Sequence, residues 1–392
     1  MAERALFISP EPPYPLTGGG ALRSASLLQF LAARYPVDIV LFHVDGASDP
    51  VEALPRGLVG DILSVPLPGH ATGTPAVITR NSLRLLRGVP PMLDRFSGQE
   101  KIIGAWLKGR TYHTAVLEHF WCASYASLVR SHCRHLYLDL HNIESEWHAR
   151  SARVESGPYS LGHKIFAAYY RRLERKLLPL FDRLIVTSSR EAARVASCPT
   201  TVYPNAIPFT PRPCGPPRYS LVFSGNLDYL PNQQAVRFFH NEVWPLLHRA
   251  HPGLKWRIVG KNPRGIPPHI AADAGIEITG PVDHAISELA CSLIAVVPIL
   301  TGSGTRVKIL EAWAAALPVV STTLGAEGLD AVPGKHLLLA DTPAEFAASI
   351  SALLNGSHLR AQLADAGRAL YEERYTWDAA WKSLLFEAFP PL

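Results

Sequence analysis

A glycine-rich turn followed by two cations and a carboxylate occupies residues 301–311, which read TGSGTRVKILE. It follows an apolar run at 293–300 that reads as a buried strand, and a helix is predicted from 306 to 316. Free amides and the positive dipole end of a helix favour an anion, and glycines let backbone come close. Helical spacing puts Gly304, Lys308 and Glu311 on one face, with Arg306 nearby. The pattern predicts a phosphate at the helix mouth and a deeper carboxylate for hydroxyls, which suits a nucleotide-sugar.

The same charged residues are also compatible with an ordinary solvated helix. Lys308 and Glu311 are three residues apart, and Arg306 and Glu311 are five apart, so they would form a surface charge cluster. A Gly-x-Gly turn is a weak signal by itself. The elements around the turn are needed to choose between the two interpretations.

The first half of the chain alternates predicted strands with predicted helices. A strand at 5–9 leads into a Pro- and Gly-rich loop that ends in Gly18, Gly19 and Gly20, then into a helix at 21–34 and a strand at 37–42. This order implies a parallel sheet. Strands at 114–117, 136–140 and 183–187 and a helix from Ser189 continue it. Three consecutive glycines are costly unless backbone must approach something, so we expect a ligand beside them; the alternative is a flexible surface loop.

Prolines mark a boundary in the middle of the chain. Residues 207–217 contain five prolines, which forbid a helix, and we predict a linker at 208–217. Beyond it we expect strands at 221–224, 256–259, 276–278, 295–297 and 319–321, and helices at 233–248, 286–291, 306–316, 344–354, 359–371 and 377–389. The predicted fold is α/β, with two doubly wound, Rossmann-like domains at 1–207 and 218–374 whose strand ends face an interdomain cleft.

The composition is that of a globular protein. The chain has 392 residues, of which 47% are hydrophobic and 18% charged, and a net charge of +5. That charge permits attraction to phosphates or an anionic membrane without requiring either. Lys and Arg form no long runs, and we expect no nucleic-acid partner. Five scattered cysteines without metal-binding spacing, no signal peptide and no apolar stretch of about 18 residues favour a cytoplasmic protein.

Short motifs in a fixed order run along nearly the whole chain. They are PPYPLTGGG at 12–20, HNIE at 141–144, YPNA at 203–206, FSGNLD at 223–228, IVG at 258–260, ITGPV at 278–282, the segment 302–320, and GAEGL at 325–329. The ordered set resembles the GT-B glycosyltransferases, specifically the retaining family four, or glycosyl transferases group 1. The resemblance implies a UDP-, GDP- or ADP-type sugar donor in the second domain. It also implies a glycan, lipid-linked or small-molecule acceptor in the first, and a last helix, about 375–392, that crosses back.

The resemblance also suggests site residues. The catalytic set comprises His119 on the acceptor side, Arg306 and Lys308 at the diphosphate, and Glu311 at the donor. Residues expected to contact substrate are Gly18, Gly19, Gly20, His141, Gly225, Asn226, Val282, Gly302, Ser303, Gly304, Thr305 and Glu327. Val282 would hold the base through its main chain, and Glu327 would meet ribose or sugar hydroxyls. The alternative for His119 is a buried structural histidine. His141 and Glu144 both end a strand, so both are candidates to face the cleft.

Two positions depart from the family pattern. The family usually has two glutamates eight residues apart, and here Ser303 replaces the first while Glu311 matches the second. The usual Arg and Lys after the first strand of the second domain are replaced by asparagines, Asn226 and Asn232. We infer that the charge has moved to Arg306 and Lys308, and we expect no metal and no cofactor.

Two alternative functions remain from the sequence. The chain resembles a non-hydrolysing nucleotide-sugar epimerase in its expected fold, and Ser303 leaves open a catalytically silent binding subunit.

The segment 164–180 has two interpretations of its own. It combines an apolar stripe (Phe166, Tyr169, Tyr170, Leu173, Leu177, Leu180) with basic neighbours. It predicts either peripheral contact with an anionic membrane or a core-facing helix with a solvated basic side.

Overall fold

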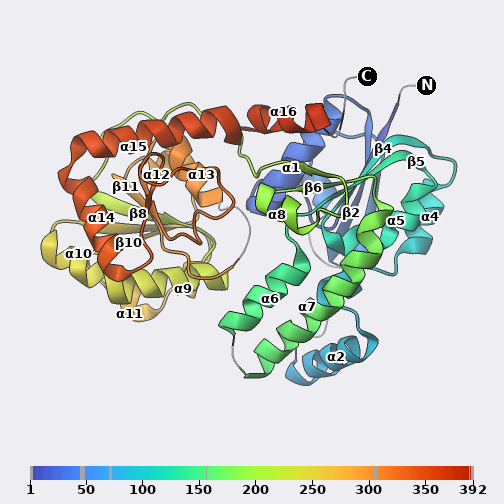
Figure 1. Ribbon diagram of the computed structural model, residues 1–392, viewed down its shortest axis with the longest axis horizontal. Coiled ribbons are helices and arrows are strands. Elements are labelled where there is room, and N and C mark those ends of the chain that lie inside the picture. The colour runs from blue at the N-terminus through green and yellow to red at the C-terminus, as the bar shows by residue number, and fades with distance from the viewer. Residues whose placement is uncertain are drawn as a thin grey trace. The chain divides into compact units, whose positions relative to one another are not determined.

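The computed structural model describes residues 3–44, 49–69, 73–155, 157–302, 307–387 and 389 (Figure 1). These residues form two compact units. The first comprises Met1–Asn205 with Trp381–Leu392, and the second is Ala206–Ala380. Each unit is built around one parallel sheet flanked by helices, as the alternating strand and helix pattern predicts.

The first unit has a seven-stranded sheet in the order β3-β2-β1-β4-β5-β6-β7. Its strands are β1 Ala5–Ser9, β2 Val37–Val44, β3 Ile62–Leu67, β4 Tyr112–Glu118, β5 Cys133–Asp139, β6 Arg183–Val186 and β7 Thr200–Val202. Its helices are α1 Gly19–Ala32, α2 Thr74–Arg87, α3 Pro91–Phe96, α4 Glu100–Leu107, α5 Ala126–Arg130, α6 Glu144–Val154, α7 Gly157–Leu177 and α8 Ser189–Arg194.

The second unit has a six-stranded sheet in the order β10-β9-β8-β11-β12-β13. Its strands are β8 Ser220–Ser224, β9 Lys255–Val259, β10 Ile276–Gly280, β11 Ile294–Val297, β12 Val319–Ser321 and β13 Leu338–Leu339. Its helices are α9 Leu230–Phe238, α10 Trp244–Ala250, α11 Pro268–Ala271, α12 Ala285–Leu289, α13 Val307–Ala314, α14 Pro343–Asn355 and α15 Ser357–Leu370, and α16 Trp377–Glu387 continues into the first unit.

The central strands are buried on both faces, which is why they read as continuous apolar runs. Every residue of β1 is buried, and so is every residue of β11. The strand predicted at 293–300 is shorter than expected, because β11 ends at Val297 and Pro298 cannot donate to the sheet. The helix predicted at 306–316 is described from Val307 and ends at Ala314, before Ala316 adopts a left-handed φ of 55°.

The proline-rich segment is held against the second unit at its start. Ile207 pairs with Thr376 in an isolated parallel bridge, and the Tyr371 hydroxyl donates to the Pro208 carbonyl at 2.8 Å. The Arg368 guanidinium donates to the Thr210 carbonyl at 2.7 Å. These bonds tie residues 207–210 to the end of α15 and the turn after it.

The last helix connects the two units. Its first residue, Trp377, donates from the indole nitrogen to the Ala206 carbonyl at 3.2 Å. Trp381 donates to the Ser26 carbonyl at 3.2 Å, and Phe389 packs edge-on against Phe30 of α1 with ring centroids 5.4 Å apart. The chain therefore returns to the first unit within α16.

The apolar stripe of α7 faces the first unit rather than solvent along most of its length. Tyr170 belongs to the hydrophobic core, and Leu173 and Leu177 pack against it. The core-facing interpretation of 164–180 is thus correct for these side chains. Among the described helices, none is both long and apolar enough to cross a membrane.

Candidate active site

The strand order of the second unit reverses between β8 and β11, so the crevice expected of a doubly wound sheet opens at their carboxyl ends. Gly225 and Asn226 follow β8 directly. Thr301 and Gly302 follow β11 by a few residues, and the Thr301 hydroxyl donates to the Gln234 side chain of α9 at 2.5 Å. Residues 67 positions apart therefore meet at this edge.

Lys308 is held at this edge by two neighbours. Its ammonium donates to Asn232 Oδ1 at 2.7 Å and lies 4.3 Å from the centre of the Phe223 ring. Asn232 is buried, and its amide nitrogen donates to the Asn226 carbonyl at 2.7 Å. Asn232 thus positions the cation and links it to the loop after β8.

Gly225 leaves room for this arrangement. A Cβ atom built on it would lie 2.6 Å from Asn232 Nδ2 and 3.1 Å from Lys308 Nζ. A Cβ atom on Gly260, after the neighbouring β9, would lie 1.8 Å from the Gly225 carbonyl oxygen. Both positions need glycine because backbone and the Lys308 side chain approach one another here.

Glu311 lies one turn along α13 and is partly exposed. Ser224 Oγ at the end of β8 donates to its Oε2 at 3.4 Å. Burial raises the pKa of the Glu311 carboxyl, and Lys308 and Ser224 oppose that rise. The carboxylate therefore stands beside the cation with capacity to accept further hydrogen bonds.

Three of the other residues predicted to bind the donor are described in the structure, and four are not. Val282 and Glu327 are partly exposed in the loops after β10 and β12, at the same edge of the sheet. Gly302 adopts a φ of 101°, which favours glycine. Ser303, Gly304, Thr305 and Arg306 lie outside the described residues.

The first unit also reverses its strand order, between β1 and β4, and carries a buried ionic network there. Ser9 Oγ at the end of β1 donates to Glu118 Oε2 at the end of β4 at 2.7 Å. Arg23 of α1 binds Asp139 of β5 with Nε at 2.8 Å and Nη2 at 2.5 Å. His141 Nε2 lies 3.2 Å from Asp139 and 3.6 Å from Glu118.

His119 occupies the centre of this edge. It follows β4 with a left-handed φ of 57°, and its ring stacks between Trp121 and His141 at centroid distances of 4.2 and 3.6 Å. Burial and the charges of His141 and Arg23 hold its pKa well below the usual value. Both ring nitrogens are buried and have no hydrogen-bond partner among the described residues. A neutral imidazole in this state can donate one hydrogen bond and accept another from a ligand bound at this edge of the sheet.

The glycine loop at 18–20 lies beside this ionic network at Gly20. Gly19 and Gly20 open α1, and a Cβ atom built on Gly20 would lie 3.3 Å from Glu11 Oε2 and 3.9 Å from His141 Nδ1. A Cβ atom on Gly18 would meet nothing within 4 Å. The close approach that three glycines suggest is therefore found at Gly20 and not at Gly18.

A metal-binding geometry exists in this network. Glu118, Asp139 and His141 each offer one ligand atom, and these atoms lie within 4.8 Å of one another. Burial lowers the pKa of His141, but the two carboxylates outweigh it and raise that pKa to about 9. An imidazolium cannot ligate a metal, and with Arg23 it balances the two carboxylates. The residues therefore fit a closed set of ion pairs better than a metal centre.

This ion-pair set predicts a pH-dependent stability. With a folded pKa of about 9 against about 6.5 unfolded, His141 stabilises the fold fully below pH 6.5 and loses that effect as pH rises through 9. The melting temperature should fall between pH 7 and 10, and His141→Gln should flatten that fall. His269→Gln, at an exposed histidine of the second unit, is the control. Parallel curves for the wild type and His141→Gln would contradict the assignment.

Sequence reasoning missed the parts of both sites that depend on distant contacts. Asn232 was recognised only as a departure from a pattern, yet it holds Lys308. Arg23, Asp139 and Ser9 were not singled out, although the motif at 203–206 belongs with them, since the Tyr203 carbonyl accepts from Arg23 at 2.7 Å. Polar residues at the end of a buried strand, such as Ser9 and Asp139, were the available signal.

The two parallel, doubly wound sheets have the architecture of the GT-B fold class. Residues 218–356 match the family described as Glycosyl transferases group 1. The matched segment contains Gly225, Val282, Lys308, Glu311 and Glu327.

One curated relative and several solved structures resemble the chain. An uncharacterized 44.6 kDa protein in the cps region of Klebsiella pneumoniae is 30% identical over 139 residues, which is 33% of this chain and 36% of that protein. Sucrose-phosphate synthase from Thermosynechococcus elongatus aligns over 97% of both chains with a TM-score of 0.71 and 16% identity.

Two further structures were solved with ligands. TarM from S. aureus, in complex with UDP, alpha-GlcNAc-glycerol and Fondaparinux, has a TM-score of 0.67 and 11% identity over 98% of this chain and 99% of that one. HepE from Anabaena, in complex with UDP and glucose, has a TM-score of 0.64 and 15% identity over 97% of this chain and 98% of that one. At these identities the structures establish the fold.

Proposed function

We propose that this protein transfers a sugar from a nucleotide-sugar donor to an acceptor hydroxyl, with retention of configuration. The observation that carries the proposal is the Lys308 ammonium, which Asn232 and Phe223 hold at the carboxyl end of β8. A fixed cation at the switch point of a doubly wound sheet is suited to a phosphate. The family match of the same segment supports a diphosphate-linked sugar as its ligand.

The donor diphosphate is proposed to lie against Lys308 and Arg306, with Gly302, Ser303, Gly304 and Thr305 supplying backbone amides. These cations would stabilise the charge that develops on the leaving diphosphate, and electrostatic stabilisation of this kind is usually the largest single contribution to catalysis. Glu311 would accept hydroxyl hydrogen bonds from the sugar, with Ser303 in place of the usual first glutamate.

The loops at the same edge complete the proposed donor site. Val282 would contact the base through its main chain, and Glu327 would meet ribose or sugar hydroxyls. Asn226 and Gly225 would border the diphosphate. UDP is the first nucleotide to test, because it is bound in the TarM and HepE structures.

The acceptor is proposed to bind to the first unit, beside His119, His141 and the glycine loop at 18–20. The ring nitrogens of His119, which have no hydrogen-bond partner in the described part of the chain, support this placement. The acceptor class is a glycan, a lipid-linked sugar or a small molecule. Free thiols at the five cysteines support a cytoplasmic location.

A divalent ion is expected to be dispensable, since Lys308 and Arg306 supply the charge that a metal would. Release of nucleoside diphosphate from the donor should therefore persist in excess EDTA. Loss of turnover in EDTA with recovery on adding magnesium or manganese would contradict the role given to these cations.

A nucleotide screen followed by turnover tests the proposed function. UDP, GDP and ADP should be added in a thermal-shift assay, where a ligand at a hundredfold excess over its Kd stabilises by about 2.7 kcal/mol. The matching sugar donors are then assayed for nucleoside diphosphate release. Stabilisation without turnover of any donor would favour the silent binding subunit that Ser303 leaves open. No stabilisation and no turnover would reject the donor site.

A further inference from the structure

Helix α2 exposes three large aliphatic side chains on its outer face. Ile78, Leu83 and Leu86 are 60%, 53% and 84% exposed. Helical spacing places them on one side of the helix, together with Thr79 and Ser82. Where the side chains of α2 are described, this outer face carries no charged group. Solvent-facing helix surfaces are normally polar, so such a face indicates contact with something apolar.

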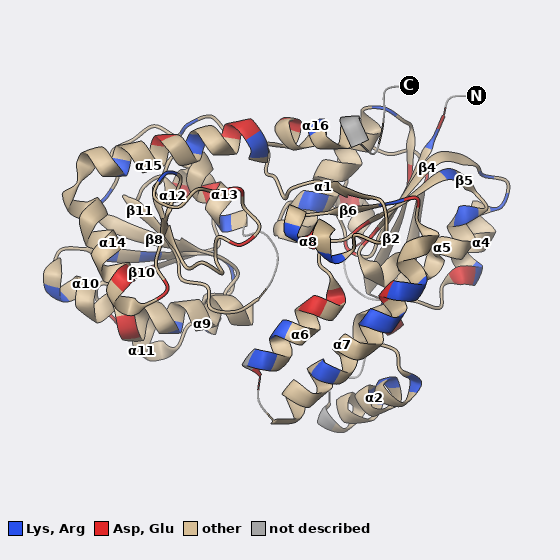
Figure 2. Ribbon diagram, in the orientation of Figure 1, with Lys and Arg blue, Asp and Glu red and all other residues tan. Residues whose placement is uncertain are grey.

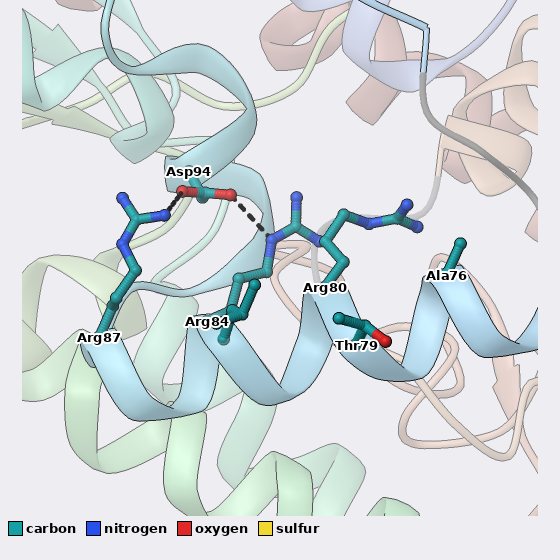
Figure 3. A pocket seen from close by; sticks show the side chains of 7 residues that line it. Ala76, Thr79, Arg80, Arg84, Arg87 and Asp94 are labelled. Atoms are coloured by element: carbon teal, nitrogen blue, oxygen red, sulfur yellow. Dashed lines mark hydrogen bonds and ion pairs between the residues drawn. The ribbon is translucent and has the colours of Figure 1, made fainter.

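Three arginines line a shallow hollow along one flank of the same helix (Figure 3). The hollow has a volume of about 390 Å³ and is lined by Ala76, Thr79, Arg80, Leu83, Arg84, Arg87 and Asp94. Asp94, on α3, lies 2.9 Å from Arg84 Nε and 3.3 Å from Arg87 Nη1. Arg84 and Arg87 share this one carboxylate, so the group of three side chains keeps a net positive charge.

The positive charge extends to the neighbouring helices. Burial, together with the like charges of Arg84 and Arg80, lowers the pKa of Arg95 on α3. Helix α7 lies beside α2, where the Tyr169 hydroxyl donates to the Leu85 carbonyl at 3.0 Å, and it carries five Lys and Arg residues against one Glu (Figure 2). An anionic surface would be attracted to this part of the first unit.

We propose that α2 docks the protein on an anionic lipid bilayer, with Ile78, Leu83 and Leu86 among the acyl chains and a lipid phosphate in the arginine-lined hollow. An uncharged aliphatic face with cations on its flank is the pattern of a helix that lies in a membrane interface. A second copy of this chain fits less well, because arginines would face arginines. The inference rests on this surface and needs no transfer activity.

Binding to vesicles tests the proposal. The wild type should sediment with vesicles of phosphatidylglycerol and phosphatidylcholine, and far less with phosphatidylcholine alone or in high salt. The double variant Ile78→Glu/Leu86→Glu should bind anionic vesicles at least tenfold more weakly. Both side chains are exposed, so its melting temperature should match the wild type. Val332→Glu, at a 52% exposed position of the second unit, is the matched control.

The arginine-lined hollow has its own test. Arg87→Gln should weaken binding to anionic vesicles about fivefold, as expected for one cation near an anionic surface. Arg212→Gln is the control, because Arg212 has similar exposure and also pairs with one aspartate, in the second unit. Equal binding to neutral and anionic vesicles, no binding to either, or an unaffected double variant would each overturn the proposal. A wild-type dimer that the double variant dissociates, without vesicle binding, would instead assign the face to self-association.

Discussion

Lys308→Ala is expected to weaken nucleoside diphosphate binding about ten- to a hundredfold. Hydrogen bonds to charged groups contribute about 1.5–3 kcal/mol, and each 1.4 kcal/mol is a factor of about ten. Lys308 is already oriented by Asn232 and Phe223, so the ammonium loses little further freedom when a diphosphate binds. Transfer should fall together with binding, since the same cation stabilises the leaving group.

Titration calorimetry measures this effect directly. Lys335→Ala, at an exposed lysine of the same unit, is the control and should bind as the wild type does. Arg306→Ala should also weaken binding, since the sequence places this cation two residues before Lys308. Unchanged affinity in both Lys308→Ala and Arg306→Ala would show that the diphosphate does not bind at this edge.

Glu311→Gln is expected to lower transfer at limiting donor concentration about five- to a hundredfold without unfolding the protein. Losing a hydrogen-bond acceptor in a buried contact costs about 1–3 kcal/mol. Burial raises the pKa of Glu311, so removing its charge should not lower the melting temperature. Gln keeps the size of the side chain and its contact with Ser224.

The contrast with Ser303→Ala makes this prediction specific. Ser303→Ala should be milder, because backbone amides of the turn remain. Glu242→Gln, at an exposed glutamate of the second unit, is the control for the charge change. If Glu311→Gln turned over as the wild type does, with an unchanged melting temperature, Glu311 would be a surface residue. The binding-subunit interpretation would then be the better one.

The sequence was sufficient for the central strands and for helices such as α1 and α14, but not for α4, α5 and α6 of the first unit. Continuous apolar runs such as β1 and β11 are recognisable because both faces of a parallel strand are buried. It was insufficient at the sheet edges. β3 contains Pro66, which argues against a strand, yet it is tolerated at an edge of the sheet. β7 and β13, of three and two residues, are too short to show a pattern.

Helix α2 was missed for a different physical reason. Its large aliphatic residues face outward, so they do not repeat with the spacing that marks a buried helix face. At the donor site, local spacing predicted Lys308 and Glu311 on one helix. The bond between Lys308 and Asn232 joins residues 76 positions apart, and only the folded sheet brings them together.

The most direct test of the donor site is hydrogen exchange with and without the nucleoside diphosphate that gives the largest thermal shift. We expect protection in peptides covering 224–234 and 307–314, where Asn232 and Lys308 lie, and loss of that protection in Lys308→Ala. Protection confined to the first unit, or equal protection in the wild type and Lys308→Ala, would contradict a donor site at the carboxyl ends of β8 and β11.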